Sequence, residues 1–154
     1  MFNALGAAVR AIERAQTEEG IAQAAISGRR YMEKLADVLF PARKKPFKGR
    51  KVGNAEYRNR IWAYIDENTA GYTTQLHGLG KEIDRIAEEF NAGLHGDWAK
   101  PRIVQALADI AILSAGLLAL NPSAARKLYF AHQKSILSFF KDAIDNPGAG
   151  EPAD

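Results

Sequence analysis

Cysteine is absent from this 154-residue sequence, and its absence excludes several kinds of site. Without thiols there is no disulfide framework, no thiolate nucleophile and no cysteine-based metal centre. Histidine is scarce too, with three residues, and neither HExxH nor another zinc-ligand spacing occurs. We therefore expect no metal and no cofactor. A chain without cysteine is also compatible with a reducing cytoplasm, where we expect this protein to reside.

Motifs of common enzyme classes are missing as well. No serine stands in a GxSxG sequence, and the glycine-rich GLGKEI at 78–83 is too short for a GxxxxGK[ST] phosphate loop. The N-terminal residues show no basic leader before an apolar run, which argues against a signal peptide. The most apolar stretch, 106–120, is shorter than the roughly 20 residues that cross a bilayer. It also contains Asp109, so we interpret it as a buried central helix.

Helical periodicity is the main feature that the sequence does contain. Hydrophobic residues make up 47% of the chain, enough for one domain with a substantial core. Between Thr17, a predicted N-cap, and Pro41, a helix stop, apolar or small residues recur at steps of three and four. Similar signals predict helices over residues 2–16, 18–40, 54–68, 74–91, 100–121 and 122–145. We predict an all-α, single-domain bundle of five to six helices over 1–145, followed by a disordered tail over 146–154.

Positive charge is concentrated in one segment. The chain has a net charge of +3, yet residues 41–60 hold eight basic side chains against one acidic side chain, Glu56. The stretch PARKKPFKGRKVG at 41–53 has two prolines and two glycines and is predicted to be a loop. Such a patch indicates a polyanionic partner, most simply nucleic acid, with a solvated basic loop as the alternative. The candidate nucleic-acid-binding residues are Arg43, Lys44, Lys45, Lys48, Arg50 and Lys51.

A second candidate site lies where the fourth predicted helix breaks, in RIAEEFNAGLHGDW at 85–98. Asn91 and His95 are four residues apart, so on a continuing helix their side chains lie about 40° apart around the axis. Histidine can exchange protons near neutral pH, and asparagine can orient a phosphate or the imidazole. Alternatively, the pair only satisfies the open end of a helix.

Four segments, taken in order, carry a family resemblance: GRRYMEKLADVLFP (28–41), the basic loop, YRNRIWAYI (57–65) and FNAGLHGDW (90–98). In this order they resemble the helical bundles of the HEPN superfamily (higher eukaryotes and prokaryotes nucleotide-binding). The closest likeness is to small bacterial members associated with phage defence and abortive infection. Active members carry an Arg-Asn-x-x-x-His motif and build a metal-independent ribonuclease site from two copies in a dimer. The resemblance implies that the histidine transfers a proton at the ribose 2′-hydroxyl and that the arginine binds the scissile phosphate.

Asn91 and His95 match two positions of that motif, whereas Phe90 stands where the arginine is expected. A positive charge must then come from elsewhere. We expect Arg58 or Arg60 to supply it, because each lies about 100° around the third helix from a residue of its buried stripe. These four polar residues are therefore the candidate catalytic residues. The resemblance also implies a homodimer.

Three functions are consistent with these features. The first is a HEPN-like RNA-interacting protein of a bacterial defence or toxin-type system with weakened or lost catalysis, which Phe90 favours. The second is an active metal-independent endoribonuclease that uses His95 at a dimer interface. The third is a non-catalytic helical module that dimerises or binds a partner protein such as an antitoxin. The first two share RNA or another nucleic acid as partner, and none of the three involves a membrane.

Overall fold

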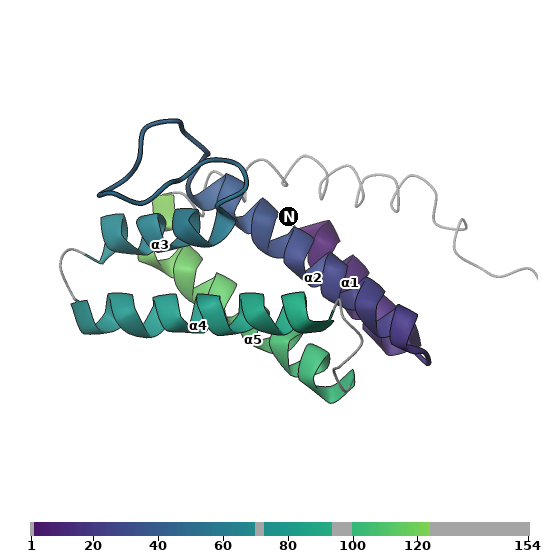
Figure 1. Cartoon of the computed structure of the whole chain (residues 1–154). Helices are drawn as coiled ribbons and strands as arrows, with labels where there is room; N and C mark the ends of the chain where they lie inside the picture. Colours follow the sequence, from purple (N-terminus) through teal and green to yellow (C-terminus); the bar gives the residue numbers. More distant parts are fainter. Residues whose placement is uncertain (1, 70–72, 94–99, 124–154) are drawn as a thin grey trace, which may run out of the picture. The chain divides into compact units, whose positions relative to one another are not determined.

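The computed structural model describes residues 2–69, 73–93 and 100–123 of the chain (Figure 1). This part contains no strand and five helices: α1 (Phe2–Arg14), α2 (Glu18–Leu39), α3 (Tyr57–Asn68), α4 (Thr73–Ala92) and α5 (Lys100–Leu120). The chain forms two compact units, Met1–Leu120 and Asn121–Asp154, and the first holds all five helices. The predicted all-α bundle is thereby confirmed. Residues 124–154 lie outside the described part of the chain. They include nearly all of the helix predicted over 122–145 and the whole tail predicted over 146–154.

The ends of α2 follow the signals in the sequence. The Thr17 hydroxyl accepts a hydrogen bond of 3.2 Å from the backbone N–H of Gly20, as expected of an N-cap. At the other end, the Phe40 N–H donates to the Ala36 carbonyl at 2.9 Å, directly before Pro41. Proline cannot donate the next helical hydrogen bond, so the chain leaves the helix there.

α2 lies at the centre of the bundle and packs against each of the other four helices. α3 and α4 lie side by side, and α5 crosses behind α4 in the view of Figure 1. The largest fully buried hydrophobic side chains are Tyr31, Met32, Leu35, Ile61, Ile65, Ile83, Ile86, Phe90, Ile103, Ile110 and Leu117. They come from α2, α3, α4 and α5, so one core joins these helices.

α5 is only partly buried, which corrects the prediction of a buried central helix. One face packs into the core, but on the opposite face Val104 is 46% and Ile112 is 73% exposed. The length argument against a membrane span also fails, because α5 has 21 residues. Its most apolar window is nevertheless 39% buried within the protein, and a core helix passes the same test of length and composition.

Candidate functional site

The basic loop between α2 and α3 has a defined fold. Phe47 and Arg50 form an antiparallel bridge through two backbone hydrogen bonds of 2.9 and 2.8 Å. The two residues between them, Lys48 and Gly49, have φ angles of 44° and 82°, as in a tight two-residue hairpin turn. Val52 anchors the returning chain in the core with 1% exposure. The basic residues of the loop thus lie on a defined hairpin, whose backbone Figure 1 draws between α2 and α3.

Two basic residues fasten this loop to α3. Arg43 Nη2 lies 3.3 Å from Glu67 Oε1, and its guanidinium carbon is 4.1 Å from the centroid of the Phe40 ring. Lys48 Nζ lies 2.9 Å from Asp66 Oδ2. Exposed ion pairs of this kind each contribute at most about 1 kcal/mol to the stability of the fold. In each pair, the carboxylate also offsets the positive charge of the loop residue. Arg43 and Lys48 therefore orient the loop more than they attract an anion.

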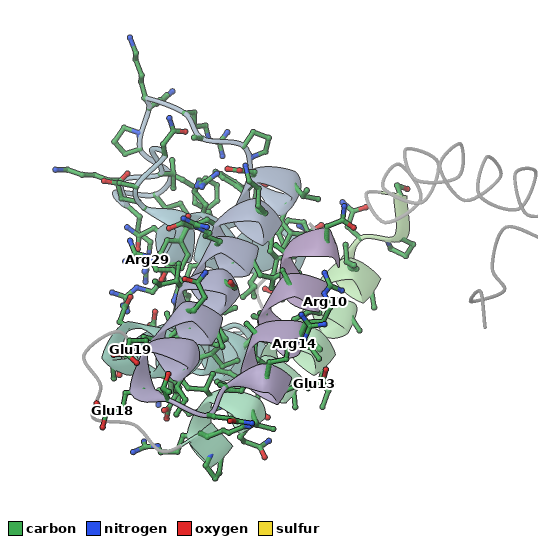
Figure 2. All side chains as sticks on the ribbon, turned by 90° about the vertical axis from the view of Figure 1, so that its right-hand side faces the viewer. Arg10, Glu13, Arg14, Glu18, Glu19 and Arg29 are labelled. Atoms are coloured by element: carbon green, nitrogen blue, oxygen red, sulfur yellow. The ribbon has the colours of Figure 1, made fainter. Side chains whose placement is uncertain are left out.

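The remaining basic residues of the loop differ in their surroundings. The Arg50 guanidinium lies over the Trp62 ring, 4.7 Å from its centroid. Lys44, Lys45 and Lys51 are exposed, and no hydrogen bond or ion pair joins their side chains to other residues in the described part of the chain. Figure 2 shows nitrogen-tipped side chains projecting from this loop away from the helices. Among the six predicted binding residues, these three lysines are the best placed to meet phosphates.

A polar pocket of about 310 Å³ lies at the start of α3. α3 begins at Tyr57 rather than at residue 54 as predicted, because residues 53–56 form a turn in which the Glu56 N–H donates to the Gly53 carbonyl. The pocket is lined by Arg29 of α2, by Asn91 in the last turn of α4, and by Ala55, Glu56, Tyr57, Arg58 and Asn59. Asn91 and Arg58 thus line one pocket, as expected of the groove beside the third helix.

Each arginine of the pocket has a carboxylate partner. Arg29 Nε lies 3.2 Å from Glu33 Oε1, and Arg58 Nη1 lies 3.9 Å from Asp84 Oδ1, a long ion pair. Burial raises the pKa of Tyr57, while the positive charges of Arg58 and Arg29 act in the opposite direction. The negative charges of Glu33 and Asp84, the partners of these arginines, act on the same phenol and raise its pKa. The pocket brings two cations from different helices to one place.

Arg60 is a structural residue, and the expectation that it emerges at the surface is wrong. Its side chain is 1% exposed, and Nη1 lies 2.8 Å from Asp37 Oδ1. Its other hydrogen bonds go to the carbonyls of Phe40 and Asn54. The physical reason is that α3 is covered on more than one side, since residues 60–65 are all buried. Arg60 joins the end of α2 and the loop to α3 and cannot bind a phosphate in this position.

Phe90, at the position of the motif arginine, belongs to the core. It is 0% exposed, and its ring fills the space beside Gly28, where an added Cβ would lie 2.4 Å from the ring carbon Cε1. Any cation near Asn91 must therefore come from other positions, of which the pocket offers Arg29 and Arg58. His95 lies outside the described residues, so its proposed part in catalysis stays a prediction.

Arg29 is the site residue that the sequence did not assign. Its ion pair with Glu33 was recognisable from the four-residue spacing, but its place beside Asn91 was not. The contact between Gly28 and Phe90 provides the reason, because it sets their chain neighbours, Arg29 and Asn91, beside one another. The contact between Gly28 and Phe90 could not be recognised from the sequence, because it depends on how α2 and α4 pack.

Comparison of the chain with protein-family models, with curated proteins and with solved structures gives no match. The side chains of the loop and the pocket therefore provide the basis for a functional interpretation.

Proposed function

We propose that this protein is a HEPN-like RNA-interacting protein of a bacterial defence or toxin-type system, which acts in the cytoplasm with weakened or lost catalysis. The observation that supports it most is the ordered loop that carries Lys44, Lys45 and Lys51 without acidic partners in the described part of the chain. Lysines in this arrangement release counterions when they meet a phosphate backbone. The family resemblance favours RNA over DNA, and the buried Phe90 favours binding over cleavage.

A filter-binding or fluorescence-anisotropy titration with single-stranded RNA tests this function directly. We expect the affinity to fall steeply as salt rises, with a log–log slope of about −0.7 for each phosphate that the loop neutralises. An affinity that does not depend on salt would contradict binding through these lysines. The effect of replacing them is argued in the Discussion.

A second candidate function is the metal-independent endoribonuclease, because Arg58 and Asn91 line one pocket. If His95 transfers a proton there, His95→Ala should slow RNA cleavage by about 10²- to 10⁴-fold without loss of folding. The measurement is cleavage of a labelled RNA in the presence of a chelator. His77→Ala is the matched control, because His77 is an exposed histidine that packs edge-on against Trp62. Equal cleavage by the His95→Ala variant and the wild-type protein would exclude this mechanism.

The outer face of α5 supports the proposal of a homodimer. The exposed large hydrophobic residues in the described part of the chain are Val9 of α1 and Val104 and Ile112 of α5. A groove of about 400 Å³ between α1 and α5 is lined mainly by apolar side chains. From Ile110 to Leu120 the sequence contains no charged residue. A helical segment without charged residues on any side is normally buried, and we propose that a second copy of the chain covers this half of α5.

Ile112→Lys is expected to convert the dimer to a monomer, because it places a charge in the middle of an apolar interface at a position that is 73% exposed within one chain. Light scattering at micromolar concentration measures the mass, and thermal denaturation checks the fold. Gln23→Lys on the exposed side of α2 is the control. A wild-type monomer would contradict the homodimer and would direct attention to a partner protein, such as an antitoxin, as the occupant of this face.

A further inference from the structure

The indole ring of Trp62 is fixed between α3 and α4. Its Nε1–H donates to Asp84 Oδ2 at 3.3 Å, and the His77 ring stands at 76° to it, with the ring centroids 6.2 Å apart. Gly80 of α4 leaves the space that the indole fills, because an added Cβ would lie 2.1 Å from the ring carbon Cη2. These contacts leave Trp62 only 9% exposed. A ring held in this way can support another planar group with little further loss of side-chain freedom.

Arg50 of the hairpin lies on this indole. Its guanidinium carbon is 4.7 Å from the centroid of the Trp62 ring. The backbone around Arg50 is tied down by the two hydrogen bonds between Phe47 and Arg50 and by a bond of 3.0 Å from the Asn59 side chain to the Lys51 carbonyl. Arg50 is nevertheless exposed, and its side chain has no hydrogen bond or ion pair in the described part of the chain. A planar cation is thus held on an aromatic ring with access to solvent.

The other arginine of the loop, Arg43, has a different set of partners. Its guanidinium carbon lies 4.1 and 5.5 Å from the centroids of the Phe40 and Phe47 rings, and Nη2 pairs with Glu67. Arg43 therefore contacts two rings and a carboxylate, and it fastens the loop. Arg50 has a ring as partner but no carboxylate in the described part of the chain, so the hydrogen-bonding edge of its guanidinium is available to a ligand.

A guanidinium on an aromatic ring suits an unpaired nucleobase as ligand. Bases stack on the planes of arginine side chains as they do on aromatic rings, and the positive charge attracts their π-electrons. The edge of the guanidinium can also donate hydrogen bonds to the ring nitrogens and carbonyl oxygens of a base. A paired base inside a duplex is already stacked on its neighbours, so its faces are not accessible to a side chain.

We propose that an unpaired RNA base stacks on Arg50, with Trp62 behind the guanidinium, while the neighbouring Lys51 contacts the phosphate backbone. This inference rests on the proposed RNA binding and deepens it, because it specifies a single strand with accessible bases as the ligand. Lysines attract any polyanion through charge, whereas stacking requires a base. The two contributions to affinity can therefore be measured separately.

Two labelled strands of equal length and charge separate these contributions: an oligouridylate, and a ribose–phosphate strand that carries no bases. Uridylate is suitable because its bases stack little on one another, so both strands are flexible. In anisotropy titrations we expect the wild-type protein to bind oligouridylate at least about fivefold more tightly, which is the lower end of what one stacked base contributes. Both affinities should fall with salt to the same extent, because both strands carry the same phosphates.

Arg50→Lys keeps the positive charge but removes the planar group. We expect this variant to bind the strand without bases as the wild type does, and to lose most of the preference for oligouridylate. Arg43→Lys is the matched control, because it makes the same exchange in the same loop at a residue that already has its partners. It should retain the preference, and thermal denaturation checks the fold of both variants.

Three results would overturn the proposal: equal affinity of the wild-type protein for the two strands, an unchanged preference in Arg50→Lys, or an equal loss of preference in both variants. Salt-dependent binding of both strands with no preference would overturn base stacking alone and would leave RNA binding through the lysines in place. Absence of salt-dependent binding to either strand would contradict that proposed function and this inference together.

Discussion

Phe90→Arg, which restores the arginine of the HEPN motif, is expected to unfold the protein rather than to create a nuclease. Phe90 is 0% exposed, and its ring occupies the space that Gly28 leaves open. The buried polar residues in the described part of the chain are Ser27, Arg60, Thr69 and Ser114, so no buried carboxylate is present to pair with a new guanidinium. An unpaired buried charge costs about 3–5 kcal/mol or more, which is a large part of the 5–15 kcal/mol that stabilises a typical domain.

Thermal denaturation followed by circular dichroism measures this effect. We expect a fall in Tm of about 10 °C or more, or loss of the cooperative transition, because 1 kcal/mol corresponds to about 2–4 °C in a domain of this size. Phe90→Leu is the control, since it removes volume but adds no charge and should cost only about 1–2 kcal/mol. If the arginine and leucine variants were equally stable, position 90 would have access to solvent, and the motif could accommodate its arginine.

The helices were predictable because their signals are local. Thr17 and Pro41 act through hydrogen bonds within a few residues, and the apolar spacing between them determines which side of α2 is buried. The start of α3 was less predictable, because its N-cap residue, Glu56, makes no side-chain hydrogen bond that marks the beginning of the helix. The outer face of α5 was predicted to be buried, but Val104 and Ile112 on that face are exposed. An apolar sequence shows that a helix can be buried but does not show how many neighbours surround it.

The candidate site was predictable only in part, and Arg58 and Arg60 show why. The two residues lie on one helix, and both were expected at the edge of the buried stripe. Arg58 does line the pocket, but Arg60 is covered by the end of α2 and by the loop. Their exposure depends on segments more than 15 residues away along the chain, such as Asp37, which pairs with Arg60. Periodicity within α3 contains no information about such neighbours.

Prediction of the binding residues in the basic loop was limited in the same way. Six basic residues in 41–53 were predicted to bind nucleic acid as a group, since composition alone does not distinguish them. The structure distinguishes them, because Arg43 and Lys48 pair with acidic residues of α3 that no sequence pattern connects with the loop. The difference matters for experiments, since replacing either residue would disturb the loop itself as well as its charge.

Replacing Lys44 and Lys45 together by glutamate is expected to weaken RNA binding by about 10- to 100-fold. Each lysine is exposed and makes no hydrogen bond or ion pair in the described part of the chain, so the change should leave the fold intact. On single-stranded RNA each lost phosphate contact reduces the salt slope by about 0.7, so the two together should reduce it by about 1.4. Anisotropy titrations of a labelled RNA at several salt concentrations measure both quantities.

Arg10→Glu with Arg14→Glu provides a control with the same change in net charge. Both arginines belong to α1, and Figure 2 shows them on that helix, away from the loop. General electrostatic attraction would make the two double variants lose affinity equally, because the total charge of the protein changes by the same amount in each. A specific contact at the hairpin would weaken binding only in the loop variant. Equal RNA affinity in the loop variant and the wild type, with equal salt slopes, would rule out the hairpin as the binding surface. The pocket at the start of α3, with Arg29 and Arg58 in its lining, would then be the next surface to test among the described residues.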